Sequence, residues 1–202
     1  MENTSRRVCT YESFSYPLSS SKMNDTGTDA LMNRCKEYAE SRLKESKYLT
    51  TLEQKIECRD LMATICFLGK DLDLNGWRCL QYCRSMGKDY SPVNFQIYHP
   101  EILAQWSWCK DWFQRCIVIK KINNKIGTTM DVKNMIQEYI FRKEGLSINI
   151  YHGLVVAAAI FCRCNQKDIF SQKITGPDIK LCISNKSPMV LYHTINNMEL
   201  GN

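Results

Sequence analysis

Long apolar runs are scarce in this sequence of 202 residues. The most apolar stretch, residues 150–162, carries no charge, but it is shorter than the about 20 apolar residues that a membrane-spanning helix needs. No apolar stretch follows the charged N-terminal residues 1–7, so the sequence predicts neither a signal peptide nor a membrane span. We therefore expect a cytoplasmic protein, with the nucleus as the alternative compartment.

Histidine is also rare, and the motifs of the common enzyme classes are missing. The chain has no Gly-rich phosphate loop, no Gly-x-Ser-x-Gly elbow and no His-Glu-x-x-His pair. A cysteine nucleophile needs a histidine within hydrogen-bond reach. The three histidines, His99, His152 and His193, do not belong to a signature of that kind. The sequence therefore predicts a protein that is not an enzyme and uses no cofactor.

Cysteine, by contrast, is abundant, with 11 residues. Without an export signal, these thiols are expected to stay reduced and to pack as small apolar side chains. The alternative is a zinc site, for which the candidate ligands are Cys79, Cys83, His99 and Cys109. Cys79 and Cys83 lie one helical turn apart and can chelate together, although the chain contains no Cys-x-x-Cys pair.

The charge balance is ordinary for a globular protein and excludes few partners. Charged residues make up 24% and hydrophobic residues 44% of the chain. The net charge of +6 permits an acidic protein or a nucleic acid as partner without requiring either.

The apolar stretch 150–162 predicts a helix that is buried on all sides, because such a helix has no face suited to water. Its small residues Gly153, Ala157, Ala158 and Ala159 permit neighbouring helices to approach closely. We therefore expect a mainly α protein, a single helical bundle around a hydrophobic central helix, with a short β-containing C-terminal segment.

Apolar periodicity and capping patterns predict five more helices. They cover residues 29–48, residues 50–69, residues 77–86, a helix that begins at Pro100, and residues 130–143. Thr50 and Glu53 have the spacing of a capping box, and Gly69 and Gly145 suit helix ends. The chain then divides into a mobile N-terminal tail (1–27), a helical domain (28–170) and a C-terminal segment (171–202).

Two regions have the character of strands. Residues 179–183 alternate apolar and polar side chains, which predicts a half-buried strand, and residues 189–195 are its expected hairpin partner. Residues 116–122 are rich in β-branched side chains, so the preceding helix either continues to Lys121 or gives way to a short hairpin.

Basic side chains gather around the tryptophans of the region from Trp106 to Lys133. Cations contact phosphates and aromatic rings stack on bases in proteins that bind single-stranded nucleic acids. The candidate contacts are Lys110, Arg115, Lys120, Lys121, Lys125, Lys133 and Trp108. In the other interpretation, Trp106 and Trp112 belong to the core. One continuous lysine face beside an exposed tryptophan favours nucleic acid, whereas lysines scattered around a closed helix favour a protein partner.

The leading functional hypothesis is a non-enzymatic intracellular interaction protein that binds and occupies a protein partner. A hydrophobic helix wrapped by amphipathic helices can leave a groove for an amphipathic helix of the partner. The abundance of Cys, Ile, Asn and Lys without a catalytic motif is typical of viral accessory or host-modulating proteins. The alternative function is binding of RNA or single-stranded nucleic acid through the region from Trp106 to Lys133.

Overall fold

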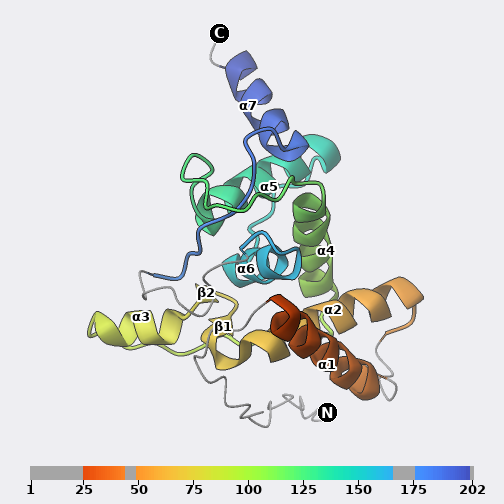
Figure 1. Ribbon diagram of the computed structural model, residues 1–202. Helices are drawn as coiled ribbons and strands as arrows, with labels where there is room; N and C mark the ends of the chain where they lie inside the picture. The colour runs from red at the N-terminus through yellow and green to blue at the C-terminus, as the bar shows by residue number, and fades with distance from the viewer. Residues whose placement is uncertain (1–24, 44–48, 166–175, 201–202) are drawn as a thin grey trace, which may run out of the picture.

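The computed structural model (Figure 1) describes residues 25–43, 49–165 and 176–200 and is mainly helical within these ranges. The helices are α1 (Asp25–Leu43), α2 (Leu52–Leu68), α3 (Cys79–Ser85), α4 (Pro100–Gln114), α5 (Thr129–Glu144), α6 (His152–Phe161) and α7 (Pro188–Leu200). A two-stranded antiparallel hairpin pairs β1 (Leu72–Asp73) with β2 (Gly76–Trp77) after a short 3-10 turn. None of the described helices combines the length and the apolar character needed to cross a bilayer.

Helix α6 is the apolar helix that the sequence predicts, and it is buried from His152 to Ile160. It contacts α2, α4, α5 and the β1–β2 hairpin, and Figure 1 shows it enclosed between these elements. The helix begins at His152, two residues into the apolar stretch 150–162, and it ends one residue before Cys162. Its alanines are fully buried, as expected where neighbouring helices approach closely.

Local capping determines where α2 and α5 begin. The side chain of Thr51 accepts a hydrogen bond from the backbone of Gln54, and the two residues form a capping box one position later than the sequence pattern suggested. Thr128 and Asp131 form a second capping box at the start of α5, and Gly145 ends that helix in a left-handed conformation. The predicted helix 130–143 is therefore confirmed with small shifts at both ends.

The first helix begins earlier and the third is shorter than predicted. Helix α1 starts at Asp25, so the end of the expected tail is helical, whereas residues 1–24 lie outside the described part of the chain. Helix α1 is described to Leu43; the rest of the predicted 29–48 helix also lies outside the described residues. Helix α3 forms after the β1–β2 hairpin, which occupies the first residue of the predicted 77–86 helix.

The C-terminal segment is not a hairpin. Residues 189–195 belong to α7, because Ser187 accepts backbone hydrogen bonds from Val190 and Leu191 and Pro188 suits the first position of a helix. Residues 179–183 are extended as predicted, but they pair with the stretch after α4, at Val118 with Ile183 and at Thr128 with Lys180. Helix α4 ends at Gln114 and does not continue to Lys121.

Candidate interaction surface

Helix α7 is attached to the rest of the protein mainly through one side. Its buried residues Met189 and Val190 point into the core, and Tyr192 packs edge-on against Tyr139 of α5 with ring centroids 5.5 Å apart. His193 Nδ1 lies 2.6 Å from a carboxylate oxygen of Glu138, also on α5. Beyond these contacts α7 projects away from the body of the molecule (Figure 1), which leaves its other side open.

That open side carries apolar residues. Ser187 directly precedes α7, and its hydroxyl lies 2.9 Å from the backbone nitrogen of Ile117, so the first turn of α7 stands next to the segment after α4. Leu191 and Ile195 follow on the same side at intervals of four residues. Ile117, Leu191 and Ile195 are 49%, 45% and 56% exposed. We call these three residues the α7 stripe.

Five exposed lysines lie on two non-helical segments, one between α4 and α5 and the other directly before α7. They are Lys120, Lys121, Lys125, Lys180 and Lys186, and we call them the lysine ledge. The side-chain amide of Asn123 donates hydrogen bonds to Ile183 O at 2.9 Å and to Asn185 Oδ1 at 2.6 Å, which ties the two segments together. Within the described ranges, no carboxylate forms an ion pair with a lysine of the ledge.

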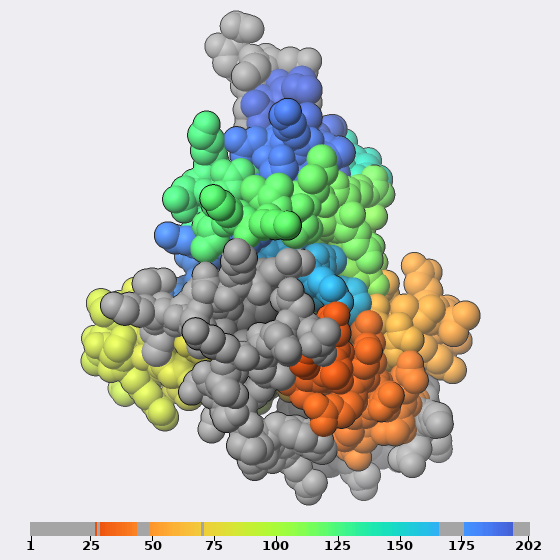
Figure 2. All heavy atoms as spheres, viewed as in Figure 1, coloured from red at the N-terminus to blue at the C-terminus, as the bar shows by residue number. Residues whose placement is uncertain are grey.

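The stripe and the ledge share one region of the molecule. Figure 2 shows the blue surface of α7 directly above the green surface formed around the end of α4 and the segment that follows it. The backbone bonds from Ser184 N to Ile117 O and from Ile119 N to Cys182 O hold that segment in place below α7. The region therefore offers exposed apolar side chains beside lysines that have no carboxylate partner in the described ranges.

The tryptophans of α4 do not form a stacking platform. Trp106 and Trp112 are 0% and 1% exposed and belong to the core, and Trp108 is partly buried against it. This agrees with the interpretation in which Trp106 and Trp112 are core residues. Nucleic-acid bases therefore meet no freely exposed tryptophan face in this region.

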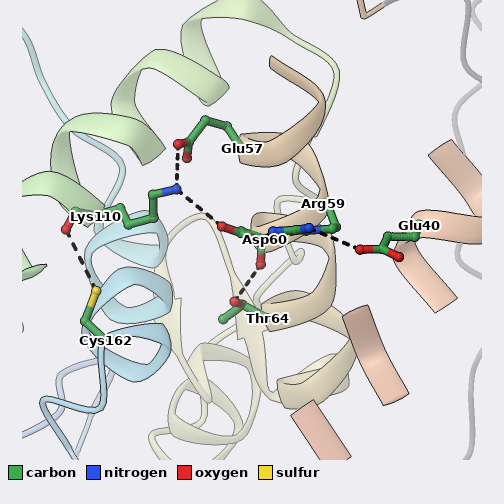
Figure 3. A network of polar contacts seen from close by, with 7 residues as sticks. All are labelled: Glu40, Glu57, Arg59, Asp60, Thr64, Lys110 and Cys162. Carbon is green, nitrogen blue, oxygen red and sulfur yellow. Dashed lines mark hydrogen bonds and ion pairs between the residues drawn. The ribbon is translucent and has the colours of Figure 1, made fainter. Parts of the chain in front are cut away.

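Lys110 is buried and is not part of the lysine ledge (Figure 3). Its Nζ lies 2.5 Å from Glu57 Oε1 and 3.3 Å from Asp60 Oδ2, both on α2. The sequence hypothesis that Lys110 contacts phosphates is therefore wrong, because its charge is already compensated between α4 and α2. Asp60 is also bound by Arg59, and Arg59 reaches Glu40 of α1, so the network links three helices.

The remaining cations of the predicted nucleic-acid surface divide into two groups. Lys120, Lys121 and Lys125 are exposed members of the ledge. Arg115 is exposed and pairs with Asp111 at 3.0 Å. Lys133 is half-buried on α5, and desolvation lowers its pKa. The structure thus brings together the three lysines after Ile119 and separates them from Lys110.

The four candidate zinc ligands do not meet. Cys79 and Cys83 lie on α3, and Figure 1 places α3 away from α4, which carries Cys109. Cys109 is fully buried in the core, whereas His99 is exposed at the start of α4. In the described part of the chain, no three His, Cys, Asp or Glu side chains are arranged to hold a metal ion.

A hollow lies between α1 and α2 and has a volume of about 470 Å³. Its lining residues are Glu40, Leu43, Leu52, Lys55, Ile56 and Arg59. Leu52 is 75% exposed at its edge. The hollow is remote from α7 (Figure 1).

The sequence analysis does not predict the α7 stripe, because it assigns residues 189–195 to a strand. The available signal was the pair Leu191 and Ile195, spaced as on one helix face, directly after a Ser-Pro helix start. The arrangement can bind a partner by burying apolar surface and by attracting negative charge. Comparisons with family models, with curated proteins and with solved structures found no match to this chain.

Proposed function

We propose that this chain is a non-enzymatic interaction protein that binds a protein partner through the α7 stripe and occupies it. The observation that supports this proposal is the apolar open side of a helix whose opposite side already packs on α5. A helix that is apolar on more than one side is normally covered by other protein. Intracellular action as a host-modulating viral protein is part of the same proposal and rests on composition.

The stripe is large enough to contribute to binding. Complete burial of one Leu or Ile side chain stabilises a complex by about 1.5–3 kcal/mol. Because the three side chains are already about half buried, their covering contributes roughly half of that each, before the entropic cost of association. We further infer that α6 acts as the central helix of a bundle and so holds the base of this surface in a fixed position.

Quantitative capture from host-cell extract tests the proposal. The wild-type chain is compared with Leu191→Ser/Ile195→Ser, which keeps the helix but removes the apolar side chains. Leu52→Ser is the matched control, because Leu52 is even more exposed and lies on α2. We expect a protein that is captured by the wild type and by the control but lost with the double variant. Equal capture by all three chains contradicts the proposal.

Nucleic-acid binding through the lysine ledge is the second candidate. Its support is the set of five lysines without a carboxylate partner among the described residues. Binding of a labelled single-stranded RNA is measured at increasing salt, because each phosphate contact steepens the fall in affinity. Lys120→Glu/Lys121→Glu is expected to abolish that binding if this candidate is correct. Unchanged RNA binding by this variant removes the ledge from consideration.

A further inference from the structure

The lysine ledge is continuous with the start of α7. Lys186 stands directly before Ser187, whose hydroxyl contacts Ile117 of the α7 stripe. At the other end, Asn123 binds Asn185 and so fixes the segment that carries Lys120, Lys121 and Lys125. A partner that covers the stripe therefore lies within reach of ledge lysines.

This combination discriminates between classes of occupant. A second copy of the chain, placed symmetrically on the stripe, brings its own ledge close to the first, and five lysines facing five lysines repel each other. A nucleic acid satisfies the lysines but leaves the apolar side chains of the stripe in water. A protein segment that carries both carboxylates and apolar side chains satisfies both parts at once.

We propose that the partner contributes an acidic amphipathic helix to this surface. Its apolar side covers Ile117, Leu191 and Ile195, and its carboxylates lie over the lysine ledge. The inference rests on the proposed protein-binding function and adds the chemistry of the partner. Leu191 and Ile195 are one helical turn apart, which is the spacing at which one helix face meets another.

Synthetic peptides test this chemistry without knowledge of the natural partner. The probe is a labelled helical peptide of about 20 residues, with Leu along one face and Glu on the flanks. Two companion peptides replace either every Glu with Lys or every face Leu with Ser. Binding to the full chain is followed by fluorescence anisotropy. We expect the acidic amphipathic peptide to bind at least about tenfold more tightly than either companion.

Two sets of variants locate the binding site. Lys120→Glu/Lys121→Glu/Lys125→Glu and Leu191→Ser/Ile195→Ser are each expected to weaken binding of the acidic peptide about tenfold or more. Lys55→Glu/Lys88→Glu is the matched control, since both lysines are exposed and lie away from α7. Added salt is expected to weaken the binding, because the exposed charges are screened. Circular dichroism verifies that every variant remains helical.

Several outcomes overturn the inference. Equal binding of the acidic and basic peptides, or equal loss with the Lys55/Lys88 control, contradicts the role of the ledge. Tighter binding to single-stranded RNA or to phosphatidylserine vesicles than to the peptide assigns the ledge to that polyanion instead. The acidic peptide can fail to bind while the Leu191→Ser/Ile195→Ser variant no longer captures a protein that the wild type captures. In that case the proposed function stands and the acidic partner is rejected. If the stripe variant loses no captured protein, the proposed function itself fails.

Discussion

The Nε2 atom of His152 lies 2.9 Å from the hydroxyl oxygen of Thr129, and this pair joins the first turns of α6 and α5. On the other side of the ring, Nδ1 lies 3.2 Å from the backbone oxygen of Asn75. Because Nδ1 faces a carbonyl oxygen, it donates there, while the opposite nitrogen, Nε2, is the atom that faces the Thr129 hydroxyl. Asp178 Oδ1 also lies 3.0 Å from Nε2, so four segments of the chain meet at one imidazole.

Replacement of His152 is therefore expected to be costly for stability. His152→Ala leaves a cavity and removes partners from the Thr129 hydroxyl and the Asn75 carbonyl, at a cost of about 2–4 kcal/mol in the free energy of unfolding. Urea unfolding measures this loss. His99→Ala is the control, because His99 is exposed and its replacement is expected to change stability by less than about 0.5 kcal/mol. Equal stability of the two variants disproves a structural role for the His152 cluster.

Lys110 provides a second prediction about stability. Lys110→Met removes the cation and leaves the carboxylates of Glu57 and Asp60 without their shared partner, which costs about 3–5 kcal/mol. Adding Glu57→Gln in the Lys110→Met background removes one uncompensated charge and is expected to recover part of the loss. Lys120→Met, on the exposed ledge, is expected to have almost no effect. Thermal or urea unfolding of the wild type and the three variants measures these differences in stability. A Lys110→Met variant as stable as the wild type contradicts a stabilising role for the network.

Gly153 is expected to tolerate no side chain. A Cβ atom at this position meets the backbone oxygen of Asp73, because the first turn of α6 sits directly on the β1–β2 hairpin. Gly153 N also donates to Leu74 O at 2.9 Å. Alanine is favoured over glycine in a helix by about 1 kcal/mol, but the overlap with backbone atoms is expected to reverse the sign and destabilise the protein.

The control for Gly153→Ala is Gly145→Asn. The backbone of Gly145 has the left-handed helical conformation, which asparagine also adopts. No atom lies within contact distance of a Cβ added at this position. We expect Gly145→Asn to change the melting temperature far less than Gly153→Ala does. A Gly153→Ala variant as stable as the wild type shows that the helix and the hairpin are not in close contact.

Three buried or partly buried thiols predict a loss of stability in alkali. Burial raises the pKa of Cys58, Cys116 and Cys162 from 9.0 to about 12. Above pH 9 the unfolded chain releases these protons while the folded chain retains them, so the stabilising contribution is complete below pH 9 and declines as the pH rises towards 12. Each such thiol lowers the free energy of unfolding by about 1.4 kcal/mol per pH unit in this window.

Urea unfolding between pH 8 and pH 10 measures this slope. Cys58→Ala removes one of the titrating groups, so the dependence of stability on pH is expected to become shallower by the contribution of one thiol. The absolute stability of this variant is lower as well, because Cys58 is fully buried. An unchanged slope contradicts the assignment of a raised pKa to Cys58.

The sequence was informative where a single local pattern decided the structure. The apolar composition of residues 150–162 identified α6, and Gly145 marked the end of α5. The start of α2 lies one position later than predicted, because the neighbouring threonines Thr50 and Thr51 compete for the same capping role.

Elements decided by distant contacts were harder to predict. Residues 179–183 alternate as a strand does, but their partner lies some 60 residues earlier, at Val118 and Thr128, which no local pattern reveals. Lys110 resembled a surface lysine because its carboxylate partners are on α2. The α7 stripe was missed for a related reason: whether Leu191 and Ile195 face the core or the solvent depends on which side of α7 packs against α5.

Site-specific photo-crosslinking tests most directly whether the α7 stripe binds a protein partner. A photoreactive amino acid replaces Ile195 in one chain and Leu52 in another, and both are irradiated inside cells that express them. We expect a discrete protein adduct from position 195 that disappears when Leu191→Ser is added, and no corresponding adduct from position 52. Adducts of the same protein from both positions, or an adduct at 195 that persists in the Leu191→Ser chain, contradict this expectation.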